Sequence, residues 1–158
     1  MGVGSVKKEV MVPVEITWKG GKLVEAKIRD LEFLMDIPPF EGERGKSLGP
    51  SATETYLAAL GRCNVISVLR SAEDEAVRIE GLKAKVQGRV EMKEPSETGY
   101  EQPIWRFRDI QIDLEIESDA DEVAIGKIIR ESHKYCTVGN AVEEGISGKF
   151  NKIEIKRP

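Results

Sequence analysis

Residues 51–72 read SATETYLAALGRCNVISVLRSA, and this stretch decides the fold class. Ser51, followed three positions later by Glu54, is the pattern of a capping box that starts a helix. From Thr53 to Ala72, apolar residues occur on nearly every face of that helix. Because a helix that is apolar all round is usually buried, we expect this one to be the central helix of the fold.

The residues before this helix predict strands. Apolar and other residues alternate with a period of two in the runs 10–18, 24–28 and 31–37, and Gly20-Gly21 marks a hairpin turn between the first two. Pro13 cannot donate a ladder hydrogen bond, so the first strand is expected at a sheet edge or with a bulge. The segment 38–50 has no period, and its length for a compact domain suggests a functional loop.

The residues after the helix return to strand patterns. The runs 82–92 and 110–116 alternate as one-sided antiparallel strands, with a loop over 94–103. A second helix is expected to start at Ser118 or Asp119, followed by a short helix over 140–144 and a last strand around 150–155. The order βββ-α-ββ-α-β predicts the α+β class. The length of 158 residues fits a single domain over residues 1–158.

Composition narrows the functional classes. With 24 basic and 28 acidic residues, the net charge is -4, which argues against nucleic-acid binding through a general basic field. No apolar run is long enough for a membrane span, and the N-terminus lacks the apolar segment of a secretory signal. Two cysteines do not make a disulfide scaffold. We therefore expect a cytoplasmic protein that engages neither membranes nor nucleic acids.

Each of the two longer helices carries one cysteine, Cys63 in the first and Cys136 at the end of the second. Both could simply be small core residues, since free cysteine is among the most buried side chains. Arg62 and Asn64 flank Cys63 within the apolar helix, which favours an interface or a cleft there. A reactive Cys63 lies too far from the helix start to be activated by the helix dipole, so it needs a cation. Arg44 in the long loop could supply it, although a solvated loop arginine is equally possible.

Three stretches of the sequence resemble one family. GPSATETYLAALGRC (49–63) is similar to the motif around the reactive cysteine of the OsmC/Ohr family of thiol-dependent peroxidases. FEGERGKSLGP (40–50) resembles that family's loop, and SHKYCTVGNA (132–141) resembles its second cysteine motif. The resemblance spans nearly the whole chain and includes the order of strands and helices.

The resemblance implies a fold and a reaction. It implies an intertwined homodimer with the active site at the subunit interface and no cofactor. Cys63 would reduce an organic hydroperoxide and become a sulfenic acid, and Cys136 would resolve it to a disulfide. A dithiol reductant of the lipoyl type would restore both thiols. In this reading the protein serves in oxidative stress defence, and the catalytic residues are Cys63, Cys136 and Arg44, with Arg70 as the substitute cation.

Two positions depart from the family pattern, because Thr53 and Pro39 stand where the peroxidases carry a catalytic Glu and Arg. Glu54 lies nine residues before Cys63, about half a turn round an ideal helix from it, and the capping role explains it better. The second hypothesis is therefore a non-catalytic dimer that binds a small apolar or thiol ligand at its interface. A third, a metal site of Cys63, Cys136 and His133, lacks a fourth ligand, and we expect no metal.

Overall fold

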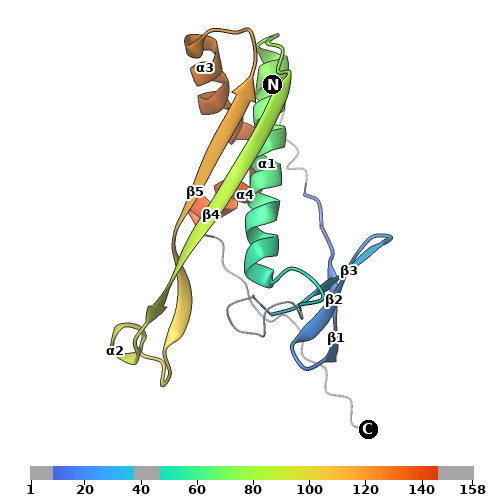
Figure 1. Ribbon diagram of the computed structural model, residues 1–158, viewed down its shortest axis with the longest axis vertical. Coiled ribbons are helices and arrows are strands. Elements are labelled where there is room, and N and C mark those ends of the chain that lie inside the picture. The colour runs from blue at the N-terminus through green and yellow to red at the C-terminus, as the bar shows by residue number, and fades with distance from the viewer. Residues whose placement is uncertain (1–8, 38–46, 146–158) are drawn as a thin grey trace, which may run out of the picture. The chain divides into compact units, whose positions relative to one another are not determined.

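The computed structural model describes residues 9–37 and 47–145 (Figure 1). The protein has the α+β class that the sequence predicts, with antiparallel sheets. The chain divides into two compact units, Met1–Tyr56 and Leu57–Pro158, and each is described by itself. The single domain over residues 1–158 stays a prediction. The elements in chain order are β1 (Glu15–Gly20), β2 (Leu23–Ile28), β3 (Leu31–Met35), α1 (Ala52–Asp74), β4 (Gly81–Lys93), α2 (Pro95–Thr98), β5 (Ile104–Glu117), α3 (Glu122–Ser132), the 3₁₀ helix η1 (His133–Tyr135) and α4 (Thr137–Glu144).

The first unit contains a three-stranded antiparallel sheet with the order β1-β2-β3. Gly20 and Gly21 both have positive φ angles, which makes them suited to the turn between β1 and β2. The first strand begins at Glu15, paired with Lys27, so the prediction that it begins at residue 10 was wrong. Pro13 explains the difference, because a residue without an N–H cannot extend the ladder past that point.

The capping box at the start of α1 is confirmed. The backbone N–H and the hydroxyl of Ser51 donate to the Glu54 carboxylate at 2.7 and 2.8 Å, and the Glu54 N–H donates back to the Ser51 hydroxyl at 3.2 Å. The backbone N–H of Ser51, more than its hydroxyl, holds the pKa of Glu54 below its ordinary value. Glu54 is therefore a structural carboxylate that fixes the start of the helix.

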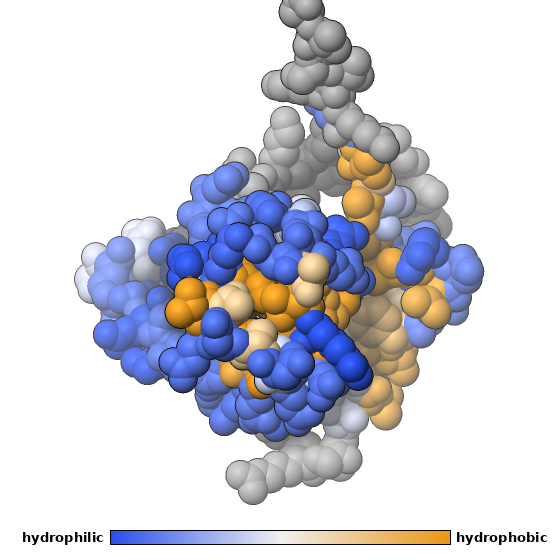
Figure 2. Space-filling view, turned by 90° about the horizontal axis from the view of Figure 1, so that it is seen from above, coloured by the Kyte–Doolittle hydropathy of each residue, from blue (hydrophilic) through white to orange (hydrophobic). Residues whose placement is uncertain are grey.

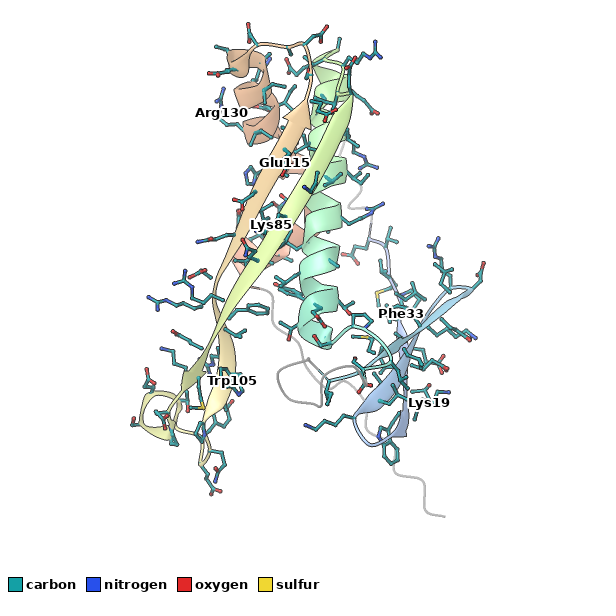
Figure 3. The ribbon with its side chains drawn as sticks, in the orientation of Figure 1. Lys19, Phe33, Lys85, Trp105, Glu115 and Arg130 are labelled. Carbon is teal, nitrogen blue, oxygen red and sulfur yellow. The ribbon has the colours of Figure 1, made fainter. Side chains whose placement is uncertain are left out.

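In the second unit, β4 and β5 pair as a long antiparallel ribbon (Figures 1 and 3). Figure 3 labels Lys85 and Glu115, which are both exposed and lie on the two strands. The opposite face packs on α1 so closely at Gly61 that an added Cβ would lie 2.8 Å from Val86 Cγ2. A β-bulge interrupts the ladder, since Arg89 pairs with Asp109 but Val90 pairs with Phe107, which leaves Arg108 as the extra residue.

The core of the second unit lies between α1 and α3. Val68, Ala72 and Ile128 are at most 2 % exposed, and partly buried side chains from β4, β5 and α3 pack around them. Figure 2 views the molecule from the end where α3 lies in Figure 1, and it shows hydrophobic residues surrounded by hydrophilic ones. The buried residues of α3 are Ile128 and Ser132.

The helix boundaries in this unit differ from the predicted ones. Asp121, not Ser118 or Asp119, caps α3, because its carboxylate accepts the N–H of Ala124 at 2.8 Å. Ser118 instead donates its hydroxyl to the carbonyl of Arg78 at 2.7 Å. The short helix α4 begins at Thr137 rather than at residue 140. The predicted last strand around residues 150–155 lies outside the described residues.

Helix α1 is buried on one side only, which corrects the expectation of burial all round. Its buried residues are Leu60, Gly61, Ser67, Val68, Ser71 and Ala72, which lie on one side of the helix, whereas Ala58 and Ala59 are exposed and Tyr56 is 39 % exposed. None of the helices in the described ranges is long and apolar enough to cross a membrane.

Candidate functional site

The second unit brings the two cysteines together. Cys63 lies in the middle of α1 and is half-buried, whereas Cys136 follows η1 and is 2 % exposed. Both are free thiols, and the side chain of Cys63 is near enough to contribute to the raised pKa of Cys136. Segments distant in the sequence therefore bring two thiols into one neighbourhood, as a thiol–disulfide reaction needs.

Cys136 is fixed by the start of α4 rather than by the end of the preceding helix. It is the N-cap residue of α4, where the N–H of Gly139 donates to its Sγ at 3.2 Å. The N–H of Asn140 donates to the Cys136 carbonyl at 2.9 Å. A thiol in this position faces the positive end of the helix dipole, so the dipole that cannot reach Cys63 acts on the second cysteine instead.

Ser67 connects the two cysteines, and it lies one helical turn after Cys63 with an exposure of 2 %. Its hydroxyl donates to the Cys63 carbonyl at 2.8 Å, and the Ser67 side chain also lowers the pKa of Cys136. The sequence patterns assigned no role to Ser67. A serine at i+4 is too common in helices to signal one.

Burial is the main reason why the pKa of the Cys136 thiol is raised, and the hydrogen bond with Cys63 adds to the increase. The Gly139 N–H and the Ser67 hydroxyl act in the opposite direction, because both favour the thiolate. The result is a protonated Cys136 with the N–H of Gly139 already in place as a donor to its charged form.

Gly139 leaves room for the Cys136 sulfur. A Cβ added at position 139 would lie 2.7 Å from the Sγ of Cys136. Any larger residue at this position would therefore displace either its own side chain or the Cys136 sulfur. The sequence analysis missed Gly139 because it placed the helix start three residues too late. The spacing of a cap residue and a glycine at N3 could have revealed the contact.

A polar cluster links the end of α1 to the residue before Cys136. The Tyr135 hydroxyl donates to the Asp74 carboxylate at 2.5 Å, and Lys134 pairs with the same carboxylate at 3.2 Å. The guanidinium of Arg70 lies over the Tyr135 ring, 6.0 Å from its centre. This structure therefore places Arg70, the substitute cation of the sequence analysis, at Tyr135. Arg44 lies outside the described residues.

A cavity of about 230 Å³ opens beside Cys136. It has an apolar wall from α1, β5 and α4 and a polar side formed by Asn64, His133 and Glu143; the full lining is Leu60, Asn64, Ile110, Ile112, His133, Cys136, Gly139, Val142 and Glu143. The imidazole Nδ1 of His133 lies 3.7 Å from a Glu143 carboxylate oxygen. Asn64, which the sequence analysis singled out as a polar residue in an apolar helix, donates its amide to the Leu60 carbonyl at 2.9 Å.

The metal alternative finds no support in the described ranges. Within residues 9–37 and 47–145, no group of three or more histidine, cysteine, aspartate or glutamate side chains could hold a metal ion. Cys63, Cys136 and His133 therefore do not form the ligand set considered from the sequence.

Comparison with known proteins assigns the family. A family model described as OsmC-like protein matches residues 44–151, which is more than half of the chain. Among the curated proteins, none matches this sequence.

Solved structures share the fold at low sequence identity. An OsmC-like protein from Mycoplasma pneumoniae superposes with a TM-score of 0.70 at 18 % identity, covering 87 % of this chain and 89 % of that one. An organic hydroperoxide resistance protein OsmC from Legionella pneumophila gives 0.63 at 14 % identity, with coverages of 86 % and 91 %. The organic hydroperoxide resistance protein OhrB of Bacillus subtilis gives 0.56 at 15 % identity, with coverages of 84 % and 90 %. With the match of its family model over residues 44–151, the chain belongs to the family of OsmC-like proteins.

Proposed function

We propose that this protein is a thiol-dependent peroxidase that reduces organic hydroperoxides through a Cys63–Cys136 disulfide. The observation that carries the proposal is the proximity of the two free thiols, since the Cys63 side chain contributes to the raised pKa of Cys136. The family and the similar structures named for organic hydroperoxide resistance support the choice of reaction.

The roles of the two cysteines follow from their surroundings. Cys63 is the more accessible thiol, so it attacks the peroxide oxygen and becomes a sulfenic acid, and the alcohol leaves. Cys136 is buried and its pKa is raised, which keeps it protonated and unreactive toward peroxide. It then attacks the Cys63 sulfur, water leaves, and the disulfide forms. A dithiol of the lipoyl type returns both cysteines to thiols.

Arg44 is proposed as the cation that stabilises the Cys63 thiolate and orients the peroxide. A guanidinium can donate two parallel hydrogen bonds, which suits both tasks. Arg44→Lys would keep the charge and lose this paired geometry, so we expect it to reduce turnover less than Arg44→Ala does.

A homodimer is part of the proposal. The single chain leaves large apolar side chains exposed in the first unit, such as Ile16 at 55 % and Trp18 at 70 %. Exposed apolar area of this kind is typical of an interaction surface. We also place the protein in the cytoplasm, where reducing conditions regenerate thiols.

The test is the mass of the intact protein after one equivalent of cumene hydroperoxide. A loss of two hydrogens per chain with no added oxygen indicates the Cys63–Cys136 disulfide. Cys136→Ser should instead gain one oxygen at Cys63, and Cys63→Ser should consume no peroxide. Unchanged peroxide consumption by Cys63→Ser would overturn the proposal.

A binding function without turnover is the second candidate, and the cavity beside Cys136 is the observation that favours it. A ligand-binding protein would show saturable binding of a small apolar thiol. It would keep both thiols free after addition of peroxide, which the same mass measurement detects.

A further inference from the structure

Tyr135, the residue directly before Cys136, is bonded to the end of helix α1. Its hydroxyl donates to the Asp74 carboxylate at 2.5 Å. Asp74 is the last residue of α1, the helix that also carries Cys63 in its middle. Tyr135 ends η1, and Cys136 follows it as the N-cap residue of α4. The hydrogen bond therefore attaches the helix of the first cysteine to the residue that precedes the second one.

One stripe of α1 meets both of these neighbouring residues. Its members follow one another at the three- and four-residue intervals of a single helix face: Cys63, Ser67, Arg70 and Asp74. The side chains of Arg70 and Asp74 contact Tyr135. The side chains of Cys63 and Ser67 lie near enough to Cys136 to affect its pKa. Two consecutive residues of the chain are therefore docked on consecutive turns of the same helix.

Two cations also contact the Tyr135 ring. The guanidinium carbon of Arg70 lies 6.0 Å from the ring centre, and Lys134 Nζ lies 5.1 Å from it. Lys134 also pairs with Asp74 at 3.2 Å, but the two side chains are 46 % and 44 % exposed, so this ion pair adds little. A hydrogen bond from a hydroxyl to a carboxylate is charge-assisted and stronger than a neutral one. The Asp74–Tyr135 bond is thus the principal tie between η1 and the end of α1.

The position of Cys136 controls how readily a disulfide can form. The two Cα atoms of a disulfide lie within ~7 Å of each other, so a loosely held Cys136 would reach this geometry only part of the time. Holding two reacting groups together raises their effective concentration, which favours both the formation of the bond and its stability. The start of α4 holds Cys136 from the C-terminal side through the Gly139 N–H. A tie at Tyr135 does the same from the N-terminal side.

We propose that the Asp74–Tyr135 hydrogen bond is a clamp that holds Cys136 beside Cys63, so that Tyr135 and Asp74 are positioning residues for the disulfide. This inference rests on the proposed function in one respect, the Cys63–Cys136 disulfide itself. The clamp contributes no atom, proton or electron to the reaction. It acts on the equilibrium between dithiol and disulfide and on the rate at which Cys136 resolves an oxidised Cys63.

The test measures the stability of the disulfide without any peroxide. The full chain is equilibrated with mixtures of oxidised and reduced glutathione, and the disulfide is counted by mass after the free thiols are alkylated. Each oxidised glutathione takes two electrons and two protons from the two cysteines and leaves as two reduced molecules, while the Cys63–Cys136 bond forms. The glutathione ratio at half oxidation gives the equilibrium constant.

Tyr135→Phe keeps the ring and its contacts with the cations but removes the hydroxyl. We expect the equilibrium constant for disulfide formation to fall by up to about tenfold, which raises the reduction potential by up to ~30 mV. Tyr100→Phe is the matched control, because it makes the same change at a residue that is 60 % exposed and follows α2. Its equilibrium constant should equal that of the wild type.

Substitutions of Asp74 separate the hydrogen bond from a general loss of structure. Asp74→Ala should lower the constant as Tyr135→Phe does, and Asp74→Asn, which keeps an acceptor oxygen, should recover part of the loss. The double variant Asp74→Ala/Tyr135→Phe should lose no more than either single one, because each removes the same bond.

The outcomes distinguish the clamp from the proposed function. A wild-type constant in Tyr135→Phe would overturn the clamp, as would an equal loss in Tyr100→Phe or additive losses in the double variant. A protein that forms the disulfide with glutathione but consumes no cumene hydroperoxide would overturn the proposed function and leave the clamp intact. A protein that forms no Cys63–Cys136 disulfide with either oxidant would overturn both.

Discussion

The two units bury their apolar side chains to very different extents. In the sheet β1–β3, Ala26 is the buried apolar residue, while Ile16 and Trp18 on β1 are more than half exposed. In the second unit, Val68 and Ile128 are almost fully enclosed by their own chain. Both units show clear strand or helix periodicity in the sequence. Periodicity therefore identifies an apolar face, but it does not tell whether the same chain or another molecule covers it.

The largest expected effect comes from the enclosed core. Ile128→Ala removes a side chain that is 0 % exposed, and a cavity of this kind costs about 2–5 kcal/mol of unfolding free energy. Chemical denaturation monitored by circular dichroism measures the loss. A cost below ~1 kcal/mol would mean that the core of the second unit does not control its stability.

Substitutions in the exposed sheet β1–β3 should weaken the association of two chains and leave the folding of each chain unchanged. Ile16→Ser combined with Trp18→Ser removes apolar area from β1, where the two residues are 55 % and 70 % exposed. We expect the protein to shift from dimer to monomer in sedimentation experiments while it keeps its far-UV spectrum. A dimer of unchanged affinity would show that β1 is not part of the interface.

Substitution of Ser67 tests how its side chain affects the reactivity of Cys136. Ser67→Ala removes a donor that lowers the pKa of Cys136, so that pKa should rise further. Disulfide formation after oxidation should slow by about tenfold, which corresponds to the ~1.4 kcal/mol of one hydrogen bond. Rapid quenching followed by mass measurement gives the rate.

Ser71→Ala is the matched control for this change. Ser71 is also a fully buried serine on α1, one turn further along, and its hydroxyl has no hydrogen-bond partner among the described residues. Its removal should leave the rate unchanged and leave stability equal or slightly higher. Equal slowing by both variants would assign the effect to packing.

Gly139→Ala should have a smaller effect on the same step. The new Cβ would displace the Cys136 sulfur, at an overpacking cost of ~1–3 kcal/mol that the higher helix propensity of alanine offsets by ~1 kcal/mol. We expect disulfide formation to slow a few-fold and the melting temperature to fall by a few degrees. An unchanged Cys136 environment in NMR spectra would contradict the close contact.

The smallest effect concerns acid stability. The Tyr135 hydroxyl and then Lys134 hold the pKa of Asp74 below its ordinary value of 3.8. Because the folded-state pKa is lowered, the stabilisation is present above that ordinary value and is lost as the pH falls through the folded-state pKa. Tyr135→Phe should therefore be less stable than the wild type at neutral pH, and the difference should shrink in acid. Thermal melts across that range check this.

Much of the fold could be read from the sequence because its signals are local. The Ser51–Glu54 box and the alternation in β4 each depend on neighbouring residues, and the structure has both. The start of β5 escaped prediction because Arg108 breaks the alternation there. The start of α3 was misplaced because Ser118, Asp119 and Asp121 can each cap a helix, and only the structure shows that Ser118 is bound to Arg78.

The candidate site was less predictable than the fold. The cysteine motifs indicated which thiols matter, but they did not show that Cys63 lies near enough to Cys136 to affect its pKa. The roles of Ser67, Gly139 and the cavity beside Cys136 depend on how α4 packs beside α1, which no local pattern encodes. Long-range packing of this kind sets the chemistry of a site without leaving a repeat or a spacing in the sequence.

The extra residue of β5, Arg108, shifts by one position the alternation of side chains along the β4–β5 ribbon. Beyond Arg108 the in-and-out phase of the strand is reversed, so Phe107 and Trp105 point to the same side as Ile110. Deleting Arg108 would remove the bulge while Phe107 stayed opposite Val90, so the side chains in the distal half of β5 would keep the faces that they have now. The bulge therefore lets β5 carry one residue more than β4 while Phe107 and Trp105 stay opposite Val90 and Met92.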